Sequence, residues 1–301
     1  MKIGTMSIVV GNKACNAKCP FCVSKMTPEN NICEKRSEVD TARYIRNIHK
    51  ACRLAEMSGV NTVLITGKGE PSLYFEDVKM ALMDIEKYKF PFVEFQTNGI
   101  LLAKWLDEYK NQKQNDYSVT PLESLMQHGV STIIISMVHY SVNRNKEIYN
   151  DNYPNLDSII DGLHEMGFSV RLSCIMLKGY IDNWPTVCNL VDYAHMNNVE
   201  QLTIRPVGKP DFSQDKDVFE FVTNHQISEA NLKYIHERLE EDGTLLMTLG
   251  HGAEVYDFVG QNICISNCLT MKPETDELRQ IIVFPDGHIR FDWTHEGAIL
   301  L

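Results

Sequence analysis

Six short apolar segments alternate with helical patterns over the first two thirds of the sequence. The predicted strands cover residues 7–10, 61–66, 92–96, 132–137, 169–176 and 201–205. Strands that are apolar throughout and joined by helices indicate a parallel sheet that is buried on both faces. Six such units are too few for a full eight-stranded barrel. We therefore predict an α/β fold with a partial (β/α)6 TIM-like barrel over residues 1–207.

The pattern changes after residue 207. A predicted helix at residues 228–241 is followed by two alternating apolar runs, residues 280–284 and 288–293. These runs flank a Pro-Asp-Gly turn and predict a hairpin. We expect residues 208–301 to form a C-terminal extension that caps the barrel.

Composition and charge exclude several classes of protein. The net charge is −11, from 40 acidic and 29 basic residues spread along the chain, so generic nucleic-acid binding is disfavoured. No run of about 18 apolar residues occurs, which argues against a transmembrane helix. The first residues also lack the apolar core of a signal peptide. A cytoplasmic protein without membrane partners is expected.

Three of the nine cysteines stand close together, as Cys15-x3-Cys19-x2-Cys22. Their thiolates are soft ligands that favour zinc or iron–sulfur centres, and a disulfide framework is not expected in a reducing cytosol. A structural zinc takes four protein ligands, and Cys33 is available as the fourth. Three cysteines on a four-iron cluster would instead leave one iron open to a ligand. Both interpretations stand at this point.

Two motifs together resemble those of the radical S-adenosylmethionine (SAM) superfamily. The first is the cysteine motif, with Phe21 directly before its third cysteine. The second is Gly67-Lys68-Gly69-Glu70-Pro71 after the second predicted strand, which resembles the family's GGEP motif with one glycine replaced. The resemblance covers roughly residues 5–207. It is closest to the branch that contains the molybdenum-cofactor GTP cyclase and the SPASM/twitch enzymes.

The resemblance implies a ligand set and a cofactor site. Cys15, Cys19 and Cys22 would hold a [4Fe–4S] cluster, and Glu70 would receive the methionyl amino group of SAM. Charged or polar residues within apolar strands need partners, which a bound zwitterionic cofactor would supply. A salt bridge at the end of the barrel is the alternative for such residues. The implied cofactor contacts are Phe21, Gly67, Gly69, Glu70, Thr97, Asn98, Ser136, Arg171, Ser173 and Arg205, the last facing cofactor or substrate.

The chemistry that the resemblance implies is reductive cleavage of SAM to a 5′-deoxyadenosyl radical, which abstracts hydrogen from a substrate. A flavodoxin- or ferredoxin-type reductant would supply the electron. We expect a small-molecule or nucleotide-like substrate. A peptide maturase is the alternative, although the first strand begins close to Met1 and leaves no room for an N-terminal peptide-recognition domain. A non-enzymatic zinc or iron–sulfur protein is the alternative from another class.

A second group of residues resembles the auxiliary-cluster segment of the same branch. There a cysteine pair precedes a hairpin that ends in cysteine, whereas this chain has Cys264, Cys268 and, at the last position, Asp292. One interpretation is a second iron–sulfur cluster on these three residues and a further ligand. The other is that the cluster was lost and the hairpin only caps the barrel.

Overall fold

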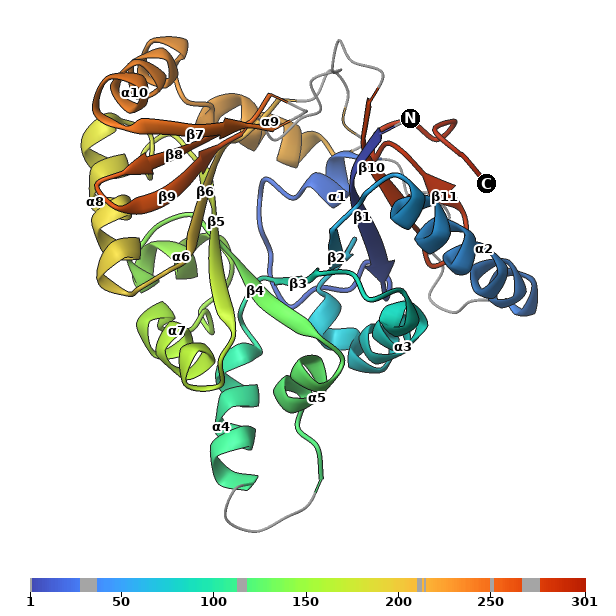
Figure 1. The fold of residues 1–301 in the computed structure, drawn as a ribbon. Helices are drawn as coiled ribbons and strands as arrows, with labels where there is room; N and C mark the ends of the chain where they lie inside the picture. The colour runs from blue at the N-terminus through green and yellow to red at the C-terminus, as the bar shows by residue number, and fades with distance from the viewer. Residues whose placement is uncertain are drawn as a thin grey trace.

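The computed structural model describes residues 2–27, 37–112, 118–209, 213, 215–249, 252–266 and 277–301. Cys33 and Cys268, which entered the metal-site hypotheses above, lie outside these ranges. The described residues form one curved, mostly parallel sheet of eleven strands, with helices along its outer side (Figure 1). Both termini lie near β10 in this view.

The central six strands are parallel and follow one another in chain order. They are β1 (Lys2–Val10), β2 (Thr62–Gly67), β3 (Phe92–Thr97), β4 (Val130–Met137), β5 (Ser169–Met176) and β6 (Gln201–Pro206). Each contains a β-branched, apolar run, which suits a strand covered on both faces. The predicted α/β fold with a partial (β/α)6 barrel is confirmed.

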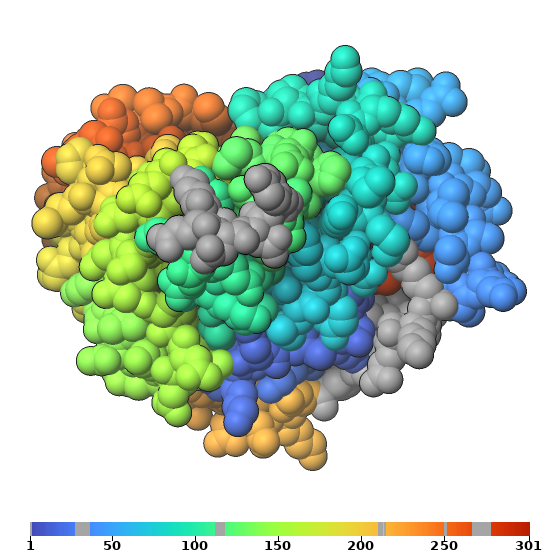
Figure 2. Space-filling view, turned by 90° about the horizontal axis from the view of Figure 1, so that it is seen from below, coloured from blue at the N-terminus to red at the C-terminus, as the bar shows by residue number. Residues whose placement is uncertain are grey.

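Helices connect these strands and cover the outer side of the sheet. They are α1 (Val23–Met26), α2 (Glu38–Met57), α3 (Phe75–Ile85), α4 (Leu102–Gln112), α5 (Pro121–Gln127), α6 (Val142–Ile148), α7 (Leu156–Glu165) and α8 (Trp184–Met196), with 3-10 turns η1 (Pro71–Tyr74) and η2 (Glu86–Tyr88). Capping boxes at Ser37, Thr120 and Asn183 start α2, α5 and α8. From below, α3, α4, α5 and α7 form much of the surface (Figure 2). None of the described helices combines the length and apolar character needed to span a bilayer.

The C-terminal third extends the sheet at both edges, and the expected cap over the barrel stays a prediction. After α9 (Lys216–His225) and α10 (Glu229–Asp242), the strands β7 (Thr244–Thr248), β8 (Glu254–Phe258) and β9 (Gln261–Ile265) join the edge of β6. The strands β10 (Glu277–Val283) and β11 (Ile289–Arg290) occupy the predicted hairpin, and β10 pairs parallel with β1. The physical reason is that open strand edges need backbone partners. The twitch-like character of this region stays a prediction.

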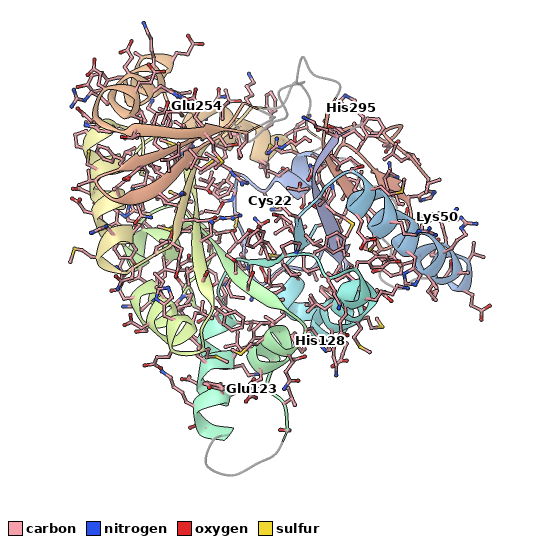
Figure 3. All side chains as sticks on the ribbon, viewed as in Figure 1. Cys22, Lys50, Glu123, His128, Glu254 and His295 are labelled. Carbon is pink, nitrogen blue, oxygen red and sulfur yellow. The ribbon has the colours of Figure 1, made fainter. Side chains whose placement is uncertain are left out.

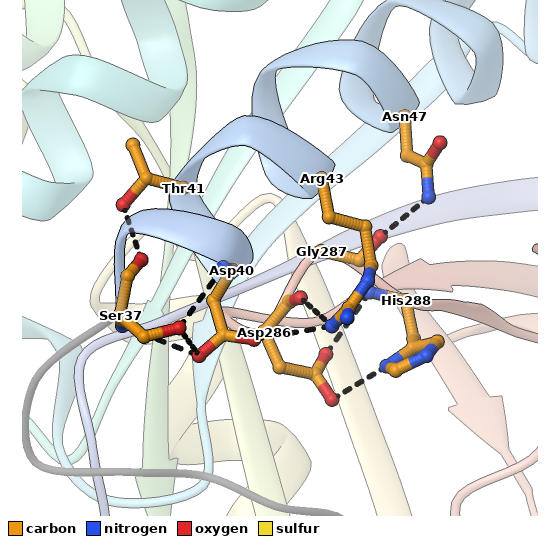
Figure 4. A network of polar contacts seen from close by, with 8 residues as sticks. All are labelled: Ser37, Asp40, Thr41, Arg43, Asn47, Asp286, Gly287 and His288. Carbon is orange, nitrogen blue, oxygen red and sulfur yellow. Dashed lines mark hydrogen bonds and ion pairs between the residues drawn. The ribbon is translucent and has the colours of Figure 1, made fainter.

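A polar network fastens the hairpin to α2 (Figure 4). Arg43 Nη1 donates to the carbonyl oxygen of Asp286 at 3.0 Å, and Asn47 Nδ2 donates to that of Gly287 at 2.8 Å. Gly287 has φ +81°, and a side chain there would overlap the backbone of Tyr44. The network therefore joins the first long helix to the last strands of the sheet.

The two faces of the sheet differ in chemistry. Side chains facing the helices, such as Ile8, Ile65 and Phe95, are buried and apolar. The inner face carries many polar residues instead. One register row across β4, β5, β6 and β9 consists of Ser136, Ser173, Thr203 and Cys264. Polar side chains inside a barrel indicate a site rather than a packed core, because burial without partners is costly.

Candidate active site

Three cysteines lie on the wall of one cavity of about 510 Å³. The chain leaves β1 at Val10 and forms a loop that carries Cys15, Cys19 and Cys22 before α1 begins. Cys22 lies inside the curve of the sheet in Figure 3, whereas the other labelled residues lie toward the periphery. The cavity opens at the carboxyl ends of the parallel strands, where active sites of barrel enzymes are found.

The cysteine loop is built against the Gly-Glu-Pro turn after β2. The backbone N–H of Gly69 donates to Asn12 and that of Glu70 donates to Ala14, both at 3.0 Å. A Cβ atom at Gly69 would overlap the carbonyl oxygen of Ala14. The two motifs are therefore one structural unit, and the glycine permits their close approach.

The opposite side of the cysteine loop is anchored near the end of α6. The backbone N–H of Lys18 donates to the carbonyl of Tyr149 at 2.8 Å, and Asn150 donates from its side chain to the carbonyl of Asn16. The ring of Phe21 packs edge-on against Tyr149, with 6.4 Å between centroids. The loop is thus held from both sides of the barrel mouth.

Glu70 presents a buried carboxylate to the cavity and is 3% exposed. It accepts hydrogen bonds from Thr97 Oγ1 at 2.6 Å and from the backbone N–H groups of Ser72 and Asn98 at 3.0 and 2.8 Å. Burial raises the pKa of Glu70, while the hydrogen bonds from Thr97 and Ser72 oppose that rise. A carboxylate accepts about four hydrogen bonds, so it can take a further donor from the cavity side.

Asn98 connects this carboxylate to the cysteine loop. Its Nδ2 donates to Asn16 Oδ1 at 2.7 Å and lies 3.8 Å from the sulfur of Cys15. Its Oδ1 accepts from the backbone N–H of Ile100 at 3.0 Å, which fixes the amide orientation. Asn98 therefore acts as an oriented donor beside the first cysteine.

Lys68, the lysine within the Gly-Lys-Gly-Glu-Pro motif, is buried on the cavity wall and is 5% exposed. Its Nζ donates to Thr27 Oγ1 at 2.7 Å, just after α1, and lies 5.9 Å from the ring centroid of Trp293. The lysine therefore ties the Gly-Glu-Pro turn to the helix that follows the third cysteine.

The cysteines fit an iron–sulfur cluster chemically. Burial, followed by the proximity of Cys22 and Cys15, raises the pKa of Cys19 to about 12, and burial also raises that of Cys15. A metal centre displaces such thiol protons, because thiolates are the ligands. Within the described ranges, no three His, Cys, Asp or Glu residues converge on a single metal ion. A four-iron cluster is wider than one ion and takes three soft thiolates placed around a cavity.

Most of the sequence-predicted site residues meet at this cavity. Arg171, Ser173 and Arg205 are not part of its lining. The predicted residues that line it are Cys15, Cys19, Cys22, Phe21, Gly67, Gly69, Glu70, Thr97, Asn98 and Ser136.

Arg171 is engaged elsewhere, as the salt-bridge alternative anticipated. Its guanidinium donates to both carboxylate oxygens of Glu94 at 2.9 and 2.6 Å, and to Gln201 Oε1 at 2.5 Å. This cluster lies toward the start of β3, β5 and β6, away from the cysteine loop. The guanidinium thus has protein acceptors of its own, and the expected contact between Arg171 and SAM stays a prediction. Ser173 is buried beside Ser136 and Thr203 in the register row.

Several cavity residues carry no family motif. Thr66 and Gln96 precede the two motif turns, and their polar character within apolar strands is a signal for an inner face. Tyr149 and Asp215 come from segments that are distant in the sequence, so no local pattern marks them.

Two of the residues proposed for a second cluster, Cys264 and Asp292, lie within the described ranges. Cys264 lies in β9 at one edge of the barrel, and Cys268 lies outside the described residues. Asp292 Oδ1 accepts hydrogen bonds from the backbone N–H groups of Thr294 and His295 at 2.7 and 2.8 Å. The part of the chain that the structure describes gathers no three potential ligands around either residue.

Comparison with known families shows to which family the chain belongs. A sequence model of the radical SAM superfamily matches residues 9–194, which is more than half of the chain. The chain belongs to the radical SAM superfamily. As a member, this protein is an enzyme that uses SAM and a [4Fe–4S] cluster. The narrower branch named above stays a prediction.

Solved structures of other radical SAM enzymes share the fold. SuiB from Streptococcus suis bound to SAM superposes with a TM-score of 0.61 at 16% identity, over 96% of this chain and 60% of that one. SuiB bound to its precursor peptide SuiA superposes with a TM-score of 0.61 at 15% identity, over 96% of this chain and 59% of that one. A radical SAM methyltransferase from Sphaerobacter thermophilus superposes with a TM-score of 0.50 at 14% identity, over 87% of this chain and 66% of that one. No curated protein sequence matches this chain.

These likenesses concern the fold alone. This radical SAM enzyme spans about 60% of the length of the SuiB chains.

Proposed function

We propose that this enzyme holds its [4Fe–4S] cluster on Cys15, Cys19 and Cys22 and binds SAM against Glu70. The observation that carries the proposal is the pair of backbone hydrogen bonds that join the cysteine loop to the Gly-Glu-Pro turn around one cavity. When bound there, the cluster would supply the electron that cleaves SAM to methionine and a 5′-deoxyadenosyl radical, which would abstract hydrogen from the substrate.

The protein's own groups bind and orient in this proposal. Glu70 accepts the methionyl ammonium of SAM, with Thr97 and the backbone of Asn98 holding the carboxylate in place. Charge-assisted hydrogen bonds of this kind are roughly twice as strong as neutral ones. Phe21 and Tyr149 form an aromatic wall beside the cysteines that excludes water from the reacting centre.

The proposed substrate is a small or nucleotide-like molecule, since a cavity of about 510 Å³ is in the usual range for such ligands. The alternative is a peptide, favoured by the shared fold with SuiB, which was solved with its precursor peptide. A flavodoxin- or ferredoxin-type protein is the proposed reductant.

The test is anaerobic reconstitution with iron and sulfide, followed by dithionite and SAM. We expect about four irons per chain and formation of 5′-deoxyadenosine. Cys15→Ala, Cys19→Ala and Cys22→Ala should each abolish deoxyadenosine formation, whereas Cys188→Ala on α8 should retain it. Deoxyadenosine from Cys19→Ala would refute the ligand set, and one tightly bound zinc without deoxyadenosine would favour a structural metal.

A further inference from the structure

Arg205 stands at the carboxyl end of β6 on the inner face of the sheet. Leu202 and Ile204 of the same strand are fully buried in the apolar core, so the alternation of the strand turns Arg205 the other way. Arg205 pairs in register with Ile175, which lines the cavity, and Val207 and Gly208 line it as well. The guanidinium therefore emerges beside the cavity, on the side of β5 and β6.

This guanidinium has no protein acceptor in the described part of the chain. Its Nε is buried without a hydrogen bond, and Arg205 forms no ion pair there. An arginine always carries its charge and five N–H donors, so a buried donor without an acceptor costs free energy. The missing acceptor does not reflect a shortage of acidic residues, because the chain has 40 acidic and 29 basic residues.

Arg171 provides an internal comparison on the same inner face. It lies deeper in the barrel, and each of its three guanidinium nitrogens donates to Glu94 or Gln201. The protein thus supplies acceptors to an arginine whose role is structural. Arg205 lies nearer the mouth, next to the lining residues Val207 and Gly208, and has no such acceptor in the described part of the chain.

The surroundings of Arg205 are polar but carry no acid in contact with it. Thr203 precedes it on the same face, in register with Ser173 and Cys264 on the flanking strands. Glu70 belongs to the turn after β2, four strands away in the sheet order. An anion held at Arg205 would therefore lie across the cavity from Glu70.

We propose that Arg205 is the anion subsite for the substrate and binds its carboxylate or phosphate group. The planar guanidinium offers two parallel N–H donors, which match the oxygens of either group. The inference rests on the proposed function, because it assigns the opposite side of the same cavity to SAM. It adds a substrate class: an oxyanion-bearing molecule rather than a neutral or cationic one.

The test is a calorimetric titration of the reconstituted, SAM-saturated enzyme with inorganic pyrophosphate and, separately, with succinate. The two probes distinguish a phosphate from a carboxylate. We expect one of them to bind to a single site, and Arg205→Ala to weaken it at least tenfold. Arg205→Lys should be intermediate, because lysine keeps the charge but not the paired donors. Arg53→Ala, on the exposed side of α2, is the matched control and should bind as the unmodified enzyme does.

Three results would overturn the subsite. The first is that neither probe binds the unmodified enzyme. The second is that Arg205→Ala, with an unchanged thermal midpoint, binds the probe as tightly as the unmodified enzyme does. The third is that Arg205→Ala loses as much affinity for SAM as for the probe. The last would make Arg205 a cofactor residue. Iron content and SAM binding of the unmodified enzyme are measured in the same preparations, and their absence would refute the proposed function instead. The titration repeated without SAM then still reports on Arg205.

Discussion

Glu70 shows how a single buried charge can be kept ready for a ligand. Three donors from the turns after β2 and β3 surround its carboxylate, which is 3% exposed. Burial alone would favour the neutral acid, and the hydrogen bonds favour the charged form. A cation that enters the cavity would therefore stabilise the charged form of Glu70 further.

Glu70→Gln should weaken SAM binding at least tenfold, because the amide removes the charge that attracts the methionyl ammonium. Iron content should stay near that of the unmodified enzyme, since the backbone N–H of residue 70 still holds the cysteine loop. Equilibrium dialysis with SAM and iron analysis give both values. Glu123→Gln, the same exchange in the capping box of α5, is the control. Unchanged SAM affinity in Glu70→Gln would contradict the assigned role.

The residue scale also shows where a sequence motif stops being informative. The cysteines, Glu70 and Asn98 could be predicted because each lies in a short motif directly after a strand. The salt bridge of Arg171 could not be assigned to a partner, because Glu94 is 77 positions away. Nothing local in the sequence indicates that these two side chains meet inside the barrel.

At the scale of elements, the site is a contact between two loops rather than a set of separate side chains. The cysteine loop and the Gly-Glu-Pro turn approach so closely that Gly69 has no room for a side chain. Lys68 extends the same turn to the end of α1. The geometry of the cysteines therefore depends on a turn that contributes no ligand.

Gly69→Ala should displace the cysteine loop, because its new methyl group meets backbone rather than a movable side chain. We expect a loss of roughly 1–3 kcal/mol in unfolding free energy, as for overpacked sites, and a large loss of bound iron. Denaturant unfolding and iron analysis measure these effects. Gly297→Ala has open space around it and is the control. Full iron content in Gly69→Ala would show that the loop is not held by this contact.

The elements themselves were predictable in part. The six central strands have continuous apolar runs, a local signal that survives in the structure. The strands β7, β8 and β9 were not among those predicted from the sequence. The pairing of β9 with β6 and of β10 with β1 could not be predicted, because it is decided by open strand edges far away in the sequence.

At the scale of the whole molecule, the contact between α2 and the C-terminal hairpin joins distant parts of the chain (Figure 4). Asn47 is 1% exposed and its side chain donates to the carbonyl of Gly287. This hydrogen bond spans 240 positions. It orients α2 over β1 and β10, the edge of the barrel from which the cysteine loop departs.

Asn47→Ala should lower the free energy of unfolding by about 1–3 kcal/mol, because it leaves the buried carbonyl of Gly287 without a donor. The control Asn61→Ala, at an exposed position before β2, should change it by less than about 0.5 kcal/mol. Urea denaturation under reducing conditions measures both. Equal stability of the two variants would show that the network of Figure 4 does not stabilise the fold.

The pairing of β1 with β10 also has a consequence for the order in which the protein matures. Ser7 and Gln280, whose side chains share a hydrogen bond between these strands, are 273 positions apart. A chain emerging from the ribosome carries β1 with one edge open until residues 277–283 have been made. Contacts over such separations form late in folding. Because the cysteine loop continues directly from β1, cluster insertion is expected to follow completion of the chain rather than accompany its synthesis.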